Sequence, residues 1–213
     1  PQKFIGDRGI VERAVITLAG ERGLLLAGDP GTAKSMLSEL LAAAVSGTSQ
    51  LTVQGTAGTT EEQLKYSWNY ATLLARGPSR DAVVASPILQ AMRRGAVARV
   101  EEITRCLPEV QDALVSILSD RRLAIPELAG LGGPSGNESE HVEFAQPGFS
   151  LIATANLRDR GVSEMSAALK RRFNFETIPS ISDAREEAKL IKDKATAALV
   201  RAGEPMRVDD AVI

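Results

Sequence analysis

The sequence predicts an α/β fold, a five-stranded parallel sheet flanked by helices. Short apolar runs alternate with longer amphipathic segments, the pattern of strands joined by crossover helices. A glycine-rich loop follows the first apolar run, and two adjacent acids end the third. The chain has 213 residues, of which 44% are apolar, so it can bury one sizeable core.

Five short apolar runs supply the expected strands. Each is short enough for a buried strand of a parallel sheet and is bounded by polar or turn-forming residues. The runs are Gly23–Gly28, Gln50–Val53, Ala96–Val100, Ser150–Asn156 and Phe173–Ile178.

Two amphipathic segments predict long helices between these strands. The segment "AKSMLSELLAAAV" follows the first strand and repeats apolar residues at helical spacing. The segment "LPEVQDALVSILSD" has Pro108 near its start, where a helix tolerates proline. The expected inward faces are Leu37, Leu40, Leu41 and Ala44 in the first segment, and Val110, Ala113, Leu114, Ile117 and Leu118 in the second.

Two longer segments interrupt this alternation, and we expect both at the surface, where partners are usually contacted. Residues 55–95 are long for one crossover and contain a Gly-Pro-Ser turn signal. Residues 126–148 include the polar stretch "GLGGPSGNESE". The flanking stretches "RLAI" and "HVEF" alternate enough to predict a hairpin that carries this loop.

The pattern changes after Pro179 to a single amphipathic helix. Ser182 or Asp183 can cap its start, and Gly203 lies just past its end. One helix cannot bury its own apolar stripe, so we expect residues 181–213 to begin a helical lid domain after an α/β domain of residues 1–180. Because the sequence does not begin with Met, we expect it to be part of a longer chain.

Composition excludes several classes of function. The formal charge is −2, so no general attraction to nucleic acid or to an anionic membrane is expected. No apolar run is long enough to cross a bilayer. One cysteine and one histidine exclude an internal disulfide and make a zinc site implausible. A cytoplasmic protein is the expectation.

The stretch "GDPGTAKS", Gly28–Ser35, predicts a phosphate-binding loop. Between a strand and a helix, successive backbone N–H groups can surround phosphate oxygens at the positive end of the helix dipole. Lys34 would contact the outer phosphates and the Ser35 hydroxyl would bind Mg²⁺. Ala33 stands where this pattern has its last glycine. We expect the helix to have begun there, so that its methyl group demands no unfavourable backbone angle.

The acidic pair Glu101-Glu102 follows the third apolar run, in "AVARVEEITR". Such a pair can complete a phosphate loop at the neighbouring strand end. Glu101 would hold Mg²⁺ through Ser35 or a water, and Glu102 would orient and deprotonate the attacking water.

In order and spacing these motifs resemble the AAA+ ATPases, and within them the MoxR family. "GDPGTAKS" resembles the Walker A motif, "ARVEEITR" the Walker B motif and "LIATAN" sensor 1. "SAALKRRF" resembles the helix end that presents an arginine to a neighbouring subunit. The resemblance runs from about Phe4 to Leu199. The two interrupting segments resemble the helix-2 insert and the hairpin before sensor 1, which couple nucleotide state to a partner in this branch.

The resemblance implies an AAA+ P-loop NTPase that uses ATP and Mg²⁺. Asn156 would help to position the water or contact the outer phosphate. Arg172, with Arg171 beside it, would reach across a subunit boundary, which implies a ring, commonly a hexamer. The "FIGD" stretch would place Ile5 near the adenine. The predicted nucleotide-binding residues are Ile5, Asp29, Pro30, Gly31, Thr32, Ala33, Lys34, Ser35 and Met36, and the predicted metal ligands are Ser35 and Glu101.

Two residues depart from the family pattern. Walker B usually opens with Asp, and Glu101 extends its carboxylate by one methylene, although Mg²⁺ demands strict geometry. Arg99 places a charge within a strand expected to be buried, so it either pairs with an acid or marks local exposure. We therefore expect nucleotide binding with slow, partner-dependent turnover.

The first functional hypothesis is a chaperone-like remodelling ATPase whose partner protein has a von Willebrand A domain. The alternatives are a nucleic-acid motor, a metal-chelatase-type subunit and a nucleotide-binding scaffold with weak hydrolysis. A motor needs basic residues toward the pore, and the acidic, glycine-rich stretch "GLGGPSGNESE" disfavours it.

Overall fold

In the computed structural model, five parallel strands form the central sheet, as predicted. Their order is β2 (Thr52–Gln54), β5 (Val97–Glu101), β8 (Ser150–Ala155), β1 (Gly23–Ala27) and β9 (Phe173–Thr177). The structure describes residues 7–129, 141–156, 163–181 and 184–203. Every pairing within this sheet is parallel, which confirms the predicted fold class.

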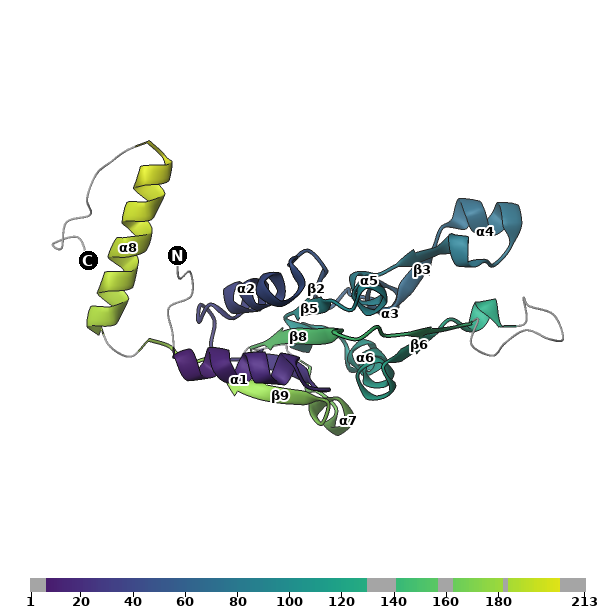
Figure 1. Ribbon diagram of the computed structural model, residues 1–213, viewed down its shortest axis with the longest axis horizontal. Helices are drawn as coiled ribbons and strands as arrows, with labels where there is room; N and C mark the ends of the chain where they lie inside the picture. The colour runs from purple at the N-terminus through teal and green to yellow at the C-terminus, as the bar shows by residue number, and fades with distance from the viewer. Residues whose placement is uncertain (1–6, 130–140, 157–162, 182–183, 204–213) are drawn as a thin grey trace.

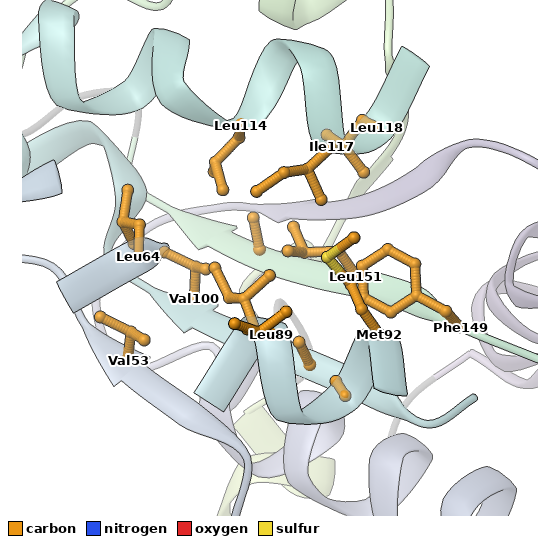
Figure 2. Packing of buried hydrophobic residues seen from close by; sticks show 14 of the residues in the cluster. Val53, Leu64, Leu89, Met92, Val100, Leu114, Ile117, Leu118, Phe149 and Leu151 are labelled. Carbon is orange, nitrogen blue, oxygen red and sulfur yellow. The ribbon is translucent and has the colours of Figure 1, made fainter. Parts of the chain in front are cut away.

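Helices cover both faces of the sheet because successive residues of each buried strand point to opposite sides. On one face, Leu24 and Leu26 pack against α1 (Arg8–Leu18) and α2 (Lys34–Ser46). On the other, Leu25 belongs to the larger core with α5 (Pro87–Arg94) and α6 (Pro108–Asp120). Figure 2 shows this second core, with side chains of α5 and α6 converging on those of the strands.

Residues 55–95 contain α3 (Glu61–Leu64), β3 (Tyr66–Trp68), α4 (Tyr70–Arg76), a 3₁₀ turn (Arg80–Ala82), β4 (Val83–Ala85) and α5. The prediction that this whole segment lies at the surface is wrong for α5. Ile88, Leu89 and Met92 are completely buried, because they follow the helical spacing and cover the sheet.

The antiparallel pair β3 and β4 and the short helix α4 project away from the sheet (Figure 1). We call β3, β4 and α4 the first ribbon. The predicted hairpin also forms: β6 (Arg122–Ala124) pairs antiparallel with β7 (Val142–Phe144). We call this pair, with the 3₁₀ turn Pro126–Leu128, the second ribbon. The polar stretch at 130–140 lies outside the described residues.

Polar contacts join the two ribbons. The Tyr66 hydroxyl donates to Glu127 Oε2 at 2.7 Å, from β3 to the turn that follows β6. Glu143 of β7 pairs with Arg93 of α5 at 2.6 Å and with Arg80 before β4 at 3.3 Å. The ribbons therefore form one connected projection.

The remaining helices are α7 (Ala167–Lys170), which precedes β9, and α8 (Ala184–Arg201). The helix predicted after Pro179 is thus present, although both candidate capping residues, Ser182 and Asp183, lie outside the described residues. No described side chain of α8 is buried, and the helix stands at the opposite end of the molecule from α4 (Figure 1). A separate lid domain stays a prediction. Among the described residues, no helix combines the length and apolar character required to span a membrane.

Candidate nucleotide-binding site

The glycine-rich loop turns sharply between β1 and α2. Gly28 has φ 157° and Gly31 has φ 82°. A Cβ on Gly28 would lie 2.5 Å from the Ile178 carbonyl oxygen, so the close approach of the chain after β9 requires glycine there. Thr32 Oγ1 donates to the Asp29 carbonyl at 2.9 Å and closes the turn.

Lys34 bonds to the backbone of its own loop. Its ammonium donates to the carbonyls of Gly28 at 2.9 Å and Asp29 at 2.6 Å. Burial lowers the pKa of Lys34, against the opposing influence of the negative charges of Asp29, Glu102 and Glu101. The loop therefore has a central cation, whose hydrogen bonds go to carbonyls of the loop itself.

The prediction for Ala33 is wrong. Its φ is 62° and its ψ is 25°, in the left-handed region, and α2 begins one residue later, at Lys34. The backbone of the last loop residue has to adopt this left-handed conformation for the chain to enter the helix. An alanine there costs about 1–2 kcal/mol relative to right-handed backbone, a penalty that glycine avoids.

A hollow of about 380 Å³ opens above the loop at the carboxyl edge of the sheet. This edge, outside the strand ends, is where open parallel sheets bind ligands. The predicted residues Pro30, Gly31, Ala33, Lys34, Ser35, Met36, Glu102 and Asn156 line it, together with Arg105, Thr154 and Ala155. Asp29 and Thr32 belong to the loop itself, and Ile5 lies outside the described residues.

Glu101 lies beneath this hollow, 6% exposed, with both carboxylate oxygens bonded. Oε2 accepts from Ser35 at 2.7 Å and from Thr154 at 2.8 Å. Oε1 accepts from Ser38 at 2.5 Å and from the Arg99 guanidinium at 2.7 Å. One buried carboxylate thus connects α2, β5 and β8.

The environment of Glu101 favours its charged form. Burial acts to raise the pKa of Glu101, but hydrogen bonds from Ser38, Ser35 and Thr154 and the charge of Arg99 outweigh it, so the pKa lies below its usual value. Of the two possibilities for Arg99, pairing with an acid is the one observed: the side chain is buried and bonded to Glu101.

Glu102 occupies a strained position at the end of β5. Its φ is 53° and its ψ is 48°, and its N–H donates to Thr154 Oγ1 at 2.9 Å. Left-handed backbone at a residue other than glycine is typical of functional sites. The half-exposed carboxylate pairs with Arg105 Nε at 2.5 Å. The candidate general base is therefore paired with a neighbouring cation.

Sequence reasoning missed three residues of this site: Ser38, Thr154 and Arg105. Ser38 lies one helical turn after Ser35, so the spacing places both hydroxyls on one face of α2. Thr154 was within the predicted fourth strand, and Arg105 follows Glu102 by three residues. Only Ser38 and Arg105 had a spacing signal that could have identified them.

Arg171 and Arg172 lie at the opposite edge of the sheet from the loop. They precede Phe173, which pairs with Gly23 at the start of β1, whereas the loop follows the end of β1. The five residues of β1 separate the two edges by about 16 Å. With Arg22 and Arg121 they line a second hollow of about 450 Å³. Arg172 Nε donates to Ser119 Oγ at 2.6 Å, and Arg171 is exposed.

The oxygen donors at the loop suit Mg²⁺ only together with a phosphate ligand. Within the described ranges no group of three or more His, Cys, Asp and Glu residues is placed to hold a metal ion. The Ser35 hydroxyl and the Glu101 carboxylate are hard oxygen donors in contact with each other. Mg²⁺ commonly takes one or two carboxylates and completes its shell with phosphate oxygens and water. The residues therefore fit the predicted metal.

Residues 23–173 match the protein family described as "AAA domain (dynein-related subfamily)". This range runs from the first residue of β1 to the first residue of β9, so it contains the loop, Glu101, Glu102 and Asn156.

Several bacterial proteins are similar over most of the chain. YehL of Escherichia coli (strain K12), an uncharacterized protein, is 52% identical over 212 residues, all of this chain and 56% of YehL. The uncharacterized protein SH1500 of Staphylococcus haemolyticus is 28% identical over 172 residues, 81% of this chain and 61% of that protein. The chain thus spans less than two thirds of the length of both relatives.

A crystal structure from Cytophaga hutchinsonii, described as a "putative ATPase", shares the fold. It superposes with a TM-score of 0.60 over 90% of this chain and 51% of that chain, at 17% sequence identity. At this identity the likeness supports the fold alone.

Replacing Ala33 with glycine should stabilise the protein. The substitution removes the left-handed penalty, so we expect the free energy of unfolding in urea to rise by about 1 kcal/mol. The matched control is Ala43→Gly, an exposed position inside α2, where the same change should cost about 1 kcal/mol. Equal losses at both positions would show that Ala33 is not strained.

Proposed function

This chain belongs to the AAA domain family of the dynein-related subfamily, and from that premise we propose that it is a MoxR-type ATPase. It binds ATP with Mg²⁺, hydrolyses it within a ring of subunits, and uses the energy to remodel or activate a partner protein. The observation that carries the proposal is that Lys34 and Glu102 line one hollow at the carboxyl edge of the sheet.

The loop residues would bind the triphosphate. Backbone N–H groups of residues 31–35 would surround the outer phosphates, helped by the start of α2. Lys34 exchanges its bonds to the Gly28 and Asp29 carbonyls for phosphate oxygens. Ser35 and Glu101 would hold Mg²⁺, which when bound neutralises charge on the outer phosphates.

Glu102 would act as the base. As the water oxygen attacks the γ-phosphorus, the bond from that phosphorus to the bridging oxygen of ADP breaks, and the Glu102 carboxylate accepts the proton of the water. For this the carboxylate would have to release Arg105, which lines the same hollow. Asn156, at the end of β8, would help to orient the water.

The position of Arg171 and Arg172 supports a ring. Both lie at the far edge of the sheet from their own loop, so an arginine that acts from this edge would contact the nucleotide of a neighbouring subunit. An arginine supplied in this way can raise the rate by about 10³–10⁵. We propose a hexamer.

The projecting ribbons would contact the partner protein. Tyr70 and Leu74 on the first ribbon are 65% and 88% exposed, and Phe144 on the second is 56% exposed. Exposed apolar side chains on a projection are suited to protein contacts. A partner with a von Willebrand A domain follows from the resemblance to MoxR proteins.

A scaffold that binds ATP with little hydrolysis is the second candidate. It is favoured by the ion pairs that hold both acids, Glu101 with Arg99 and Glu102 with Arg105. The rate of phosphate release by the wild-type protein distinguishes the remodelling ATPase from the scaffold.

The central test compares Lys34→Ala and Glu102→Gln with the wild type. Lys34→Ala should abolish ATP binding. Glu102→Gln should keep the affinity for ATP and lower phosphate release by about 10²–10⁴-fold, because only the proton acceptor is lost. The control is Glu12→Gln, which breaks a comparable exposed pair with Arg8 and should leave both properties unchanged. Wild-type turnover in Glu102→Gln would exclude this residue as the base.

Glu101→Asp should slow hydrolysis by about 10²-fold and lower stability. The shorter side chain cannot keep all its bonds to Ser35, Ser38, Thr154 and Arg99. Phosphate release and urea unfolding measure the two effects. Faster hydrolysis by the aspartate variant would instead show that Glu101 impairs turnover and would favour the scaffold.

Mixing two inactive variants tests the shared site. Lys34→Ala has a defective loop and intact arginines, and Arg171→Ala/Arg172→Ala has the reverse. Each should be inactive alone. In random mixed rings, half the loops and half the neighbouring arginines are intact, so about one quarter of wild-type phosphate release should return. Mixed oligomers without recovered activity would refute a site shared between subunits.

A further inference from the structure

We propose that Arg99 is a built-in counter-cation of the metal site. It positions the Glu101 carboxylate before the metal arrives and thereby makes ATP binding only weakly dependent on Mg²⁺. The inference rests on the proposed function in one respect, that Glu101 is a metal ligand. Arg99 acts through Glu101, so it is a positioning residue.

The first argument is the place of Arg99 in the sheet. Val97, Arg99 and Glu101 alternate along β5 and point to the face covered by α2. Val97 belongs to the apolar cluster on that face, whereas Arg99 is 8% exposed and carries a full charge. An arginine is seldom buried unless it is paired, so its presence here requires a compensating anion.

The second argument is that the guanidinium is bonded through all three nitrogens. Nε donates to Ser38 Oγ at 3.0 Å, and Nη1 donates to the Ser49 carbonyl at 3.0 Å. Nη2 donates to the Ser35 carbonyl at 3.3 Å and to Glu101 Oε1 at 2.7 Å. The cation is therefore fixed against the first turn of α2, whose Ser35 is the other proposed metal ligand.

The third argument is how the two carboxylate oxygens divide their partners. Oε1 is bonded to Arg99 and Ser38, both outside the residues that line the hollow. Oε2 is bonded to Ser35 and Thr154, both of which line it. Arg99 thus balances the charge at Oε1, whereas Oε2 is the carboxylate oxygen bonded to residues that line the hollow.

Two consequences follow. Without Arg99 the buried carboxylate would lack a full counter-charge in the metal-free protein, which would cost stability. A fixed cation beside Glu101 also repels a second cation, so Arg99 lowers the affinity for Mg²⁺ at this carboxylate. By linkage, the gain in ATP affinity that Mg²⁺ provides is reduced by the same factor.

The test measures ATP affinity in excess Mg²⁺ and in EDTA for the wild type and Arg99→Met. In the wild type, the ratio of the affinity in Mg²⁺ to the affinity in EDTA should be small. Arg99→Met should raise that ratio about tenfold, and its melting temperature without Mg²⁺ should fall by about 10 °C. Arg99→Lys, which keeps the charge, should return the ratio toward that of the wild type.

The control is Arg13→Met. Arg13 forms a bidentate ion pair with Glu176, a buried acid of β9. Neither residue lines the hollow. This variant should lose stability without any change in the Mg²⁺ ratio. A lowered melting temperature in Arg99→Met with an unchanged ratio would overturn the proposal and leave Arg99 a purely structural residue.

If Arg99→Met does not fold, Arg99→Met/Glu101→Gln removes both charges together and can be measured instead. Its ratio should exceed that of Glu101→Gln alone, because the cation that repels Mg²⁺ is absent, and equal ratios in these two variants would overturn the proposal. Failure of the proposed function looks different: the wild type would then bind ATP under neither condition.

Discussion

The structure depends on the need to satisfy one buried carboxylate. Glu101 is almost inaccessible and accepts four hydrogen bonds, from two residues of α2, one of β8 and one of its own strand. A buried charge with a missing partner would be costly, so the network specifies how α2 lies against β5 and β8. The loop before α2 and the acid after Glu101 are positioned as a result.

Lys34 and Glu102, the two charged groups proposed to act on the nucleotide, both have local partners in the structure. Lys34 is bonded to carbonyls of its own loop, and Glu102 is paired with Arg105. Nucleotide binding then exchanges one set of bonds for another and does not have to order free side chains. Such an exchange keeps the cost of binding low, because little conformational entropy remains to be lost.

The strands, the two long helices and the acid pair could be predicted from sequence, because each has a local signature in periodicity or spacing. Three features were not predicted, although one of them, α5, follows the helical spacing. Whether Ala33 is helical depends on whether α2 begins at Ala33 or one residue later, at Lys34. The contribution of α5 to the core was missed because α5 ends a long segment whose earlier part, the first ribbon, does project from the sheet. The partner of Arg99 was two residues away, but only the packing of α2 decides that the pair is buried.

The ion pairs of Glu143 also have a consequence for how the ribbons are attached. This one carboxylate pairs with Arg80, in the 3₁₀ turn between α4 and β4 of the first ribbon, and with Arg93 of α5. The chain of α5 continues through Gly95 directly into β5, the strand that ends in Glu101 and Glu102. Glu143 therefore connects both ribbons to α5, and only Gly95 and Ala96 separate the end of α5 from the strand that leads to the acid pair.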